Sequence, residues 1–277
     1  MTQDPSQQRV LVTGAAGGIG RVLRPRLARE GRLLRLLDVA GLEPTAAGEN
    51  VEVVVASVTD LHAMRAACAG VDAVIHLAAI PGEAAWEDIL ATNIDGTRCV
   101  IEAARLAGVG RIVLASSNHA AGFWARDEAP PEGLPADAFP RPDTYYGVSK
   151  AVLEALGSLY HHRFGMDVIC LRIGSCLPRP HNARALATWL SHDDTGRLFE
   201  ACLSAPRPGF RVVWGISRNT RRWWSLEAGE ELDYHPVDDS EGFAAEVLAG
   251  TGEPDLRDPV HRLVGGEFCS MPLGVAP

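Results

Sequence analysis

Short apolar runs alternate with longer amphipathic stretches along the first two-thirds of the chain, and this alternation constrains the fold more than any other feature. Strands that alternate with helices pair in parallel through right-handed crossovers. The chain is therefore expected to form an α/β fold, a doubly wound parallel sheet with helices on both faces. Four helices are predicted: one that ends near residue 30, one that begins near residue 60, and two that cover residues 87–107 and 144–164. The predicted strands lie at residues 9–13, 33–38, 51–56, 72–77, 111–115 and 167–172.

The pattern loosens after residue 176. Residues 192–205 and 239–249 are predicted helices, residues 210–214 are a predicted strand, and residues 218–224 form an irregular basic and aromatic stretch. A region of this length is too short for an independent domain. We expect residues 177–277 to pack on the core of residues 9–176 as a small cap over the carboxyl ends of the strands, where open α/β sheets bind ligands.

The two remaining segments lack regular patterns. Residues 1–8 are polar and are expected to form a disordered tail, without the apolar core of a signal peptide. Residues 126–143 carry five prolines, which exclude a regular helix or a central strand. This loop precedes the predicted helix 144–164, and it is either a rim or lid of a site or a passive surface insertion.

Composition narrows the class of protein. Hydrophobic residues make up 47% and charged residues 22%, a globular balance, and the net charge of −9 argues against a nucleic-acid partner. No apolar run approaches the roughly 20 residues that span a bilayer, so no membrane association is expected and the protein is predicted to be cytoplasmic. The six cysteines form no C-x-x-C pair and are expected to be reduced core thiols, with no metal site.

A glycine-rich turn follows the first predicted strand. Gly14, Gly17 and Gly20 are spaced G-x-x-G-x-x-G between that strand and a helix, which predicts a Rossmann turn that binds a pyrophosphate at the helix N-terminus. Asp38 ends the second strand, 18 residues beyond Gly20. A carboxylate there accepts hydrogen bonds from the adenosine ribose and repels a 2′-phosphate, so NAD is predicted rather than NADP. Asp60 is a helix N-cap, an adenine contact, or both.

A tyrosine and a lysine share one face of the helix predicted at residues 144–164. Tyr146 and Lys150 are four residues apart. A nearby ammonium and an oxidised nicotinamide favour the phenolate, which lowers a phenol pKa normally near ~10. Tyr146 is then predicted to take a hydroxyl proton as a general base. A serine at the end of the fifth strand, Ser116 or Ser117, is expected to hold the substrate oxygen.

With these pieces in place, the chain resembles the extended short-chain dehydrogenase/reductase family. The segments that carry the resemblance are the glycine turn and residues 76–79, 93–97, 116–117 and 146–150. Within that family the chain is most similar to the uronate dehydrogenases. The segments that carry this closer similarity are residues 115–119, 141–143, 171–176, 188–194 and 213–215.

This resemblance implies oxidation of the C1 hydroxyl of cyclic galacturonate or glucuronate, with NAD as the hydride acceptor and an aldarolactone as the product. It implies Ser117, Tyr146 and Lys150 as the catalytic group. Asn118 and His119 would bind sugar hydroxyls, Arg184 would pair with the C6 carboxylate, Ser175 would contact the nicotinamide amide, and Asn93 would hold the lysine through water. The full set of predicted cofactor residues is Gly14, Gly17, Gly18, Ile19, Gly20, Asp38, Asp60, Leu77, Ala78, Ala79, Asn93, Tyr146, Lys150, Ile173 and Ser175.

One departure and two alternatives remain at this point. Pro81 stands where the family carries a serine near the substrate, so one sugar hydrogen bond is expected to be lost or replaced. A nucleotide-sugar epimerase or dehydratase would use the same Tyr146, Lys150 and NAD, but it needs a larger C-terminal region. A non-catalytic NAD-sensing protein would not need Tyr146 and Lys150 beside Ser117. A homo-oligomer is also expected, with the long helices 87–107 and 144–164 as candidates for pairing between subunits.

Overall fold

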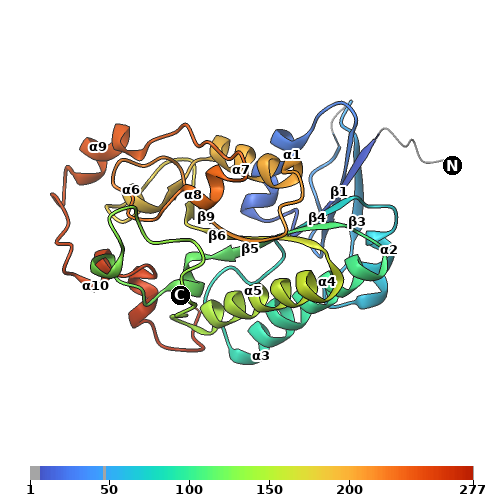
Figure 1. The fold of residues 1–277 in the computed structure, drawn as a ribbon, viewed down its shortest axis with the longest axis horizontal. Helices are drawn as coiled ribbons and strands as arrows, with labels where there is room; N and C mark the ends of the chain where they lie inside the picture. Colours follow the sequence, from blue (N-terminus) through green and yellow to red (C-terminus); the bar gives the residue numbers. More distant parts are fainter. Residues whose placement is uncertain (1–6, 46–47, 277) are drawn as a thin grey trace.

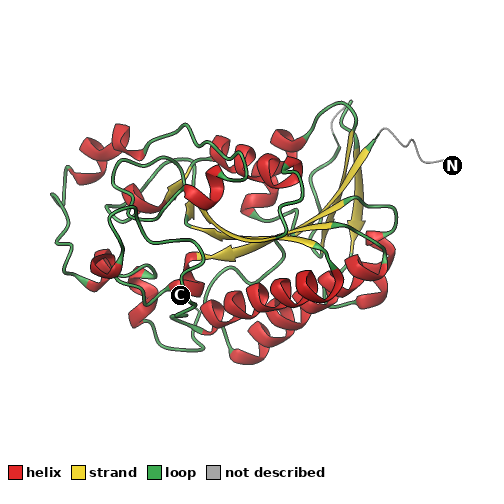
Figure 2. Cartoon of the chain, in the orientation of Figure 1, coloured by secondary structure: helices red, strands yellow, loops and turns green. Residues whose placement is uncertain are grey.

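The computed structural model describes residues 7–45 and 48–276. Seven strands form one parallel sheet in the order β3-β2-β1-β4-β5-β6-β9 (Figures 1 and 2). The order in which the chain adds strands to the sheet reverses between β1 and β4. This arrangement confirms the predicted doubly wound sheet. The strands are β1 (Gln8–Thr13), β2 (Arg32–Asp38), β3 (Val51–Val55), β4 (Ala73–His76), β5 (Arg111–Ser117), β6 (Asp167–Ile173) and β9 (Phe210–Gly215).

The predicted tail of residues 1–8 overlaps the sheet at its end. Residues 1–6 lie outside the described residues, but Gln8 already belongs to β1, where its backbone N–H donates to the carbonyl of Gly31 at 2.8 Å. The boundary of the predicted tail was therefore wrong at residue 8.

Helices cover both faces of the sheet, as predicted. The helices α1 (Gly18–Leu27) and α7 (His192–Ser204) lie on one face, and α2 (Leu61–Cys68), α4 (Gly96–Leu106) and α5 (Tyr145–Phe164) lie on the other (Figure 1). Successive strand residues point to opposite faces, so both must be apolar in a strand covered on both sides. In β1, Leu11 packs into the cluster under α2 and α4, whereas Val12 packs into the cluster under α7.

The helix predicted at residues 87–107 is divided into three segments. A short turn, α3 (Trp86–Asp88), is followed by a π-helical segment, η1 (Ile89–Asp95), and then by α4. A π segment has i→i+5 hydrogen bonds and is frequently found at functional sites. Here it includes the buried Asn93, a predicted site residue.

The C-terminal region lies beyond the end of the sheet that is opposite the N-terminus (Figure 1). Most of its elements are short, and the helix predicted at residues 239–249 is a 3₁₀ turn (Ser240–Phe243) followed by α9 (Ala244–Leu248). Further turns follow it, so α9 is not the final helix. The remaining elements are β7 (Ser175–Cys176), α6 (Ala185–Thr188), β8 (Trp189–Leu190), α8 (Glu227–Glu230), α9 (Ala244–Leu248), α10 (Pro259–Arg262) and a 3₁₀ turn (Gly266–Ser270).

The proline-rich loop of residues 126–143 is packed into a third apolar cluster. Leu134 pairs with Trp224 and accepts a 2.9 Å hydrogen bond from the indole of Trp214. The carbonyl of Ala138 accepts a 2.8 Å hydrogen bond from the buried Arg172 guanidinium. The prediction of a passive surface insertion is therefore wrong. The buried loop residues Leu134, Ala136 and Ala138 help to form this cluster, together with Trp214, Ile216, Trp224, Leu226 and Val264.

The cysteines are free thiols, and four of the six are buried. Within the described ranges, no cluster of three or more His, Cys, Asp or Glu side chains could hold a metal ion. No helix in residues 7–45 and 48–276 combines the length and apolarity needed to cross a membrane.

Candidate active site

A cleft of about 1020 Å³ lies at the carboxyl ends of the parallel strands. Its wall is formed by the turn after β1, the end of β2, the segment after β4, the end of β5 and the first turn of α5. Most of the predicted site residues line this one cleft. They are Gly14, Gly17, Gly18, Ile19, Gly20, Asp38, Leu77, Ala78, Ala79, Ser117, Tyr146, Lys150 and Ile173.

The glycine turn has the shape that a dinucleotide needs. Gly14 has φ +72°, and a Cβ there would lie 2.6 Å from the backbone nitrogen of Ala78. A Cβ on Gly20 would lie 2.5 Å from the carbonyl oxygen of Ala15. Only glycine fits both positions, and a Cβ on Gly18 would point into open space, where a pyrophosphate could approach the backbone. The residues present therefore fit NAD at the N-terminus of α1.

The carboxylate of Asp38 is fixed beside this turn. Its Oδ2 accepts a hydrogen bond from the Ala16 backbone at 2.9 Å, and its Oδ1 accepts one from Ala40 at 2.9 Å. Asp60, in contrast, caps α2 by accepting from the Ala63 backbone at 3.0 Å and does not line the cleft. The cleft is bounded there by Ser57 and Val58. The N-cap interpretation of Asp60 is confirmed, and adenine contact stays a prediction.

Replacing Asp38 with alanine is expected to relax the preference for NAD. A carboxylate at this position repels a 2′-phosphate, so its removal should raise kcat/KM with NADP relative to NAD by about tenfold or more. Initial rates with both cofactors measure this ratio. Asp60→Asn, which keeps a capping side chain outside the cleft, is the matched control and should leave the ratio unchanged. An unchanged ratio in Asp38→Ala would remove Asp38 from cofactor selection.

Tyr146, Ser117 and Lys150 meet at the inner wall of the cleft. Thr144 caps α5 through a 3.1 Å hydrogen bond from the Gly147 backbone, which sets the first helical turn and places Tyr146 and Lys150 on its buried face. The Tyr146 hydroxyl faces Ser117, which acts to lower the pKa of the phenol. The Lys150 ammonium lies 5.3 Å from the centre of the Tyr146 ring and donates to the carbonyl of Ala115 at 2.7 Å. Ser117 lies beside the tyrosine in this cleft, and its role in holding the substrate oxygen stays a prediction.

Ser116 has a structural role instead. Its hydroxyl donates to Glu154 at 2.6 Å, and Glu154 forms a buried bidentate ion pair with Arg172 at 2.9 and 2.8 Å. The two adjacent serines at the end of β5 both line the cleft, but the Ser116 hydroxyl is bound to Glu154.

Burial dominates the electrostatics of this group in the protein alone. Desolvation raises the pKa of Tyr146 to about 12, and the hydrogen bond with Ser117 opposes that shift. Desolvation also lowers the pKa of Lys150 to about 8. The expected lowering of the tyrosine pKa is therefore absent without the cofactor. A phenol that is neutral here needs a further positive charge in the cleft, such as an oxidised nicotinamide, to become a base at neutral pH.

Lys150 offers a direct test of this electrostatic picture, because it is the one lysine in the chain. In protein labelled with ¹³Cε-lysine, its single NMR signal should titrate with a midpoint near 8, since burial disfavours the ammonium. The same signal in urea-unfolded protein should titrate near ~10.4. A folded midpoint as high as the unfolded one would show that Lys150 is not desolvated.

A buried chain of hydrogen bonds supports the floor of the site. Thr13 and Thr97 flank His76 at 2.8 and 3.0 Å, and Thr97 donates to the carbonyl of Asn93 at 2.5 Å. Desolvation, followed by the nearby Lys150 charge, lowers the pKa of His76 to about 3, so this imidazole is neutral. These hydrogen bonds thus join β1 and β4 to the π segment.

The side chain of Asn93 links the π segment to the first turn of α5. Its Oδ1 accepts from the Ile80 backbone at 2.8 Å, and its Nδ2 donates to the Ser149 hydroxyl at 3.2 Å. Ser149 in turn donates to the carbonyl of Tyr146 at 2.7 Å. Asn93 therefore holds the backbone around the tyrosine by direct hydrogen bonds, whereas the predicted water link to Lys150 stays a prediction.

The geometry agrees with comparisons to known proteins. The model of the NAD dependent epimerase/dehydratase family matches residues 10–201, which include the glycine turn and the Tyr146–Lys150 pair. The chain belongs to this family. A uronate dehydrogenase from Pseudomonas syringae pv. tomato is 43% identical over 274 residues, covering 99% of this chain and 97% of the relative.

Two further relatives bear on the cofactor and the substrate of this epimerase/dehydratase-family protein. The crystal structure of a tyrosine-to-alanine mutant of uronate dehydrogenase from Agrobacterium tumefaciens, complexed with NAD, has a TM-score of 0.88 and 43% sequence identity. The alignment covers 96% of this chain and 98% of that one. An NAD-dependent glucose-6-phosphate dehydrogenase from Haloferax volcanii is 39% identical over 89% of this chain and 98% of the relative. The cofactor of this family member is NAD, and the protein is an NAD-dependent oxidoreductase.

Three of the predicted substrate residues of this family member, Asn118, His119 and Arg184, contact the C-terminal segment instead of lining the cleft. Asn118 donates to the carbonyl of Val264 at 3.0 Å, and the guanidinium of Arg184 donates to the same oxygen. His119 bonds to Asp143 at 2.6 Å, and its ring stacks on Phe268 at 4.0 Å. The ring of His119 also lies 5.8 Å from that of Tyr146. These residues are therefore clustered beside the tyrosine, although they do not line the large cleft.

Ser175 is the remaining predicted residue of the family's site. Its hydroxyl is hydrogen-bonded to Thr188 at 2.9 Å, and the neighbouring Gly174 and Cys176 line the cleft in its place. Its contact with the nicotinamide amide stays a prediction.

Sequence reasoning missed three residues that shape this site. Glu83, 1% exposed, accepts from the Tyr146 backbone at 2.9 Å and from Gly274 at 2.7 Å, so it ties the C-terminal segment to the start of α5. Asp143 orients His119, and Phe268 covers it. The proximity of Asp143 to Tyr146 in the sequence was a usable signal. Glu83 and Phe268 reach the site only through contacts over long sequence distances.

Proposed function

We propose that this protein oxidises the C1 hydroxyl of cyclic hexuronates, galacturonate and glucuronate, to the aldarolactone with NAD. The observation that carries the proposal is the buried group of Ser117, Tyr146 and Lys150 in the same cleft as the glycine turn, with an arginine and an asparagine clustered behind it. The similarity to uronate dehydrogenases supports it, because it extends over the C-terminal third as well as the nucleotide-binding core.

Each member of the catalytic group has a distinct task in this reaction. Bound NAD supplies the acceptor for the hydride that leaves C1. The Ser117 hydroxyl holds the C1 oxygen next to the Tyr146 hydroxyl, which takes its proton as a general base. The Lys150 ammonium supports the phenolate by its charge, and its hydrogen bond to Ala115 fixes its position.

Arg184 is the group that would recognise the acid function of the sugar. It forms a hydrogen bond to Val264 and is partly buried, and no described carboxylate forms an ion pair with it. Desolvation lowers its pKa. A planar guanidinium binds a carboxylate with two parallel hydrogen bonds, which a neutral sugar cannot accept in the same way. Asn118 donates to the same Val264 oxygen, so its amide lies close to the Arg184 guanidinium. One uronate would therefore accept hydrogen bonds from both side chains.

His119 and Pro81 set the remaining sugar contacts. Asp143 fixes the ring of His119 through Nδ1, which leaves Nε2 for a sugar hydroxyl. Pro81 lines the cleft and has neither a hydroxyl nor an N–H. We infer that a backbone group or water replaces the missing contact in both uronates.

The assembly and the compartment are part of the same proposal. Leu106 on α4 and Leu159 on α5 are 46% and 50% exposed on the outer helical layer, which supports pairing between subunits of a homo-oligomer. The free thiols suit the reducing cytoplasm. Light scattering of the purified protein tests the oligomer.

A substrate panel tests the proposed function. Galacturonate, glucuronate, galactose, arabinose and glucose 6-phosphate are each supplied with NAD or NADP, and the absorbance of the reduced cofactor is followed. We expect steady reduction of NAD with the two uronates and rates at least tenfold lower with the neutral sugars. A preference for glucose 6-phosphate would redirect Arg184 to a phosphate, and no reduction with any sugar would leave an epimerase or an NAD-sensing protein.

A further inference from the structure

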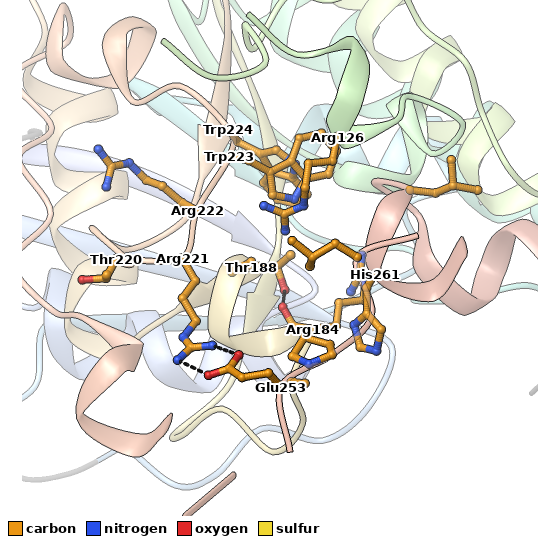
Figure 3. Close-up of a pocket in the computed structure, with 15 residues that line it drawn as sticks. Arg126, Arg184, Thr188, Thr220, Arg221, Arg222, Trp223, Trp224, Glu253 and His261 are labelled. Carbon is orange, nitrogen blue, oxygen red and sulfur yellow. Dashed lines mark hydrogen bonds and ion pairs between the residues drawn. The ribbon is translucent and has the colours of Figure 1, made fainter. Parts of the chain in front are cut away.

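A second cavity, of about 520 Å³, is lined by Arg184 and shares no lining residue with the nucleotide cleft. Its volume is in the range of small-molecule sites. The proline-rich loop, α6 and the irregular stretch around Trp223 contribute to its wall, together with residues 253–263 (Figure 3). None of the predicted catalytic or cofactor residues lines it. It shares only Arg184 with the predicted site.

The charge of this cavity is opposite to that of the protein as a whole. Arg221 is neutralised by Glu253 at 2.5 Å and by Glu241 at 2.6 Å, as the dashed lines to Glu253 in Figure 3 show. Arg126 and Arg184 form no ion pair with a described carboxylate. Arg126 instead lies over the Trp223 ring at 5.1 Å, and Arg184 donates to a backbone carbonyl. Together with Arg222, which donates to the carbonyl of Asn219, they leave three guanidiniums of this cavity without an ion pair among the described residues. In a chain with net charge −9 this creates a local preference for anions.

Two buried donors of this cavity have no acceptor. Among the described residues, Arg126 Nε and Trp224 Nε1 are the two buried side-chain nitrogens or oxygens without a hydrogen-bond partner. Trp224 is 1% exposed. Buried donors are nearly always paired, and each unpaired one costs free energy until an acceptor arrives. Both residues line this cavity, so both deficits point to a ligand that brings oxygen acceptors.

We propose that this cavity is a second binding site, for a sugar diacid whose carboxylates pair with Arg126 and Arg184. Desolvation lowers the pKa of both arginines, and a bound carboxylate would relieve that penalty. A diacid fits better than a lone phosphate ion. The cavity is large for a phosphate, and its wall combines an indole face with the hydroxyls of Thr188 and Thr220, as suits a carbohydrate.

The shared arginine couples the two sites. This step rests on the proposed function, in which Arg184 binds the C6 carboxylate of the substrate. One guanidinium cannot form a pair of parallel hydrogen bonds with each of two carboxylates at once. A diacid bound in the cavity therefore competes with the uronate for Arg184. The lactone product opens in water to such a diacid, and the site would therefore let the end product slow its own formation.

Calorimetric titration with galactarate tests the site without turnover. We expect the wild-type protein to bind galactarate at least tenfold more tightly than inorganic phosphate, and not to bind the neutral galactitol. Arg126→Gln should bind galactarate about 10–100-fold more weakly, because it loses a charged hydrogen-bonding fork. Arg126→Lys should be intermediate, and the exposed Arg65→Gln on α2 is the matched control with wild-type affinity.

Kinetics with galacturonate separate this site from the active site. Arg126→Gln should keep kcat/KM within about twofold of wild type but lose inhibition by galactarate. Equal galactarate binding in wild type and Arg126→Gln, or equal affinity for phosphate and galactarate, would overturn the proposal. A parallel loss of kcat/KM would also overturn it, because the cavity would then belong to the active site. If the wild-type protein binds galactarate but oxidises no uronate, and Arg126→Gln loses galactarate binding, the proposed function is wrong and this second site is still supported.

Discussion

Replacing Tyr146 with phenylalanine is expected to lower kcat by about 10²–10⁴-fold, the usual contribution of a positioned general base. The ring is buried and loses only its hydroxyl, so the change removes a proton acceptor without opening a large cavity. The glycine turn and Asp38 lie on other elements, and NAD affinity should therefore stay within about twofold. Steady-state rates and NAD titration by fluorescence measure the two effects separately.

The neighbouring tyrosine gives a matched control for this substitution. Tyr145 packs edge-on against Trp86 at 5.3 Å and does not line the cleft, so Tyr145→Phe should keep near-normal turnover. The pH profile adds a second readout. Because the pKa of Tyr146 is raised in the protein alone, kcat/KM should increase as pH rises toward that pKa, and Tyr146→Phe should lose this dependence. Wild-type turnover in Tyr146→Phe would exclude the phenol as the base.

Replacing Arg184 with glutamine is expected to produce the second largest effect, a loss of uronate use. Hydrogen bonds to charged groups contribute about 1.5–3 kcal/mol each, so kcat/KM for galacturonate should fall roughly 10–150-fold or more. NAD affinity should not change, since Arg184 does not line the nucleotide cleft. The activity on a neutral sugar, however low, should be unaffected, because that substrate has no carboxylate for the guanidinium to bind.

Arg179 supplies the control for Arg184. It precedes α6 as Arg184 does, but it is half exposed and paired with Glu246 at 2.5 Å. Arg179→Gln should therefore retain the galacturonate kcat/KM of wild type. If Arg184→Gln retained it too, the carboxylate would be bound elsewhere.

The sheet and the nucleotide cleft could be predicted because their signals are local. The apolar runs gave six of the seven main strands within two residues, and the run at residues 210–214 gave β9. Gly20 is required by contacts within its own turn, and Gly14 by its positive φ and by the close approach of Ala78, which follows β4. The glycine spacing carries this information in the sequence. Tyr146 and Lys150 share a helix face, which depends only on helical periodicity.

The substrate side could not be predicted in the same way, because it is assembled from distant segments. Glu83 and Gly274 are 191 residues apart, and Asn118 reaches Val264 across 146 residues. The π segment at Ile89–Asp95 has a helical pattern in the sequence, and Asn93 within it bonds to Ile80, 13 residues away. The role of the proline-rich loop in a third apolar cluster likewise depends on Trp214 and Trp224, which lie far along the chain.

The fate of the C1 hydrogen tests the central claim most directly. Galacturonate deuterated at C1 is incubated with the protein and NAD, and the reduced cofactor and the sugar product are analysed by mass spectrometry. Our account predicts reduced cofactor that carries one deuterium, together with an unlabelled aldarolactone in equal amount. Deuterium that stays on a sugar isomer, with no reduced cofactor released, would contradict it.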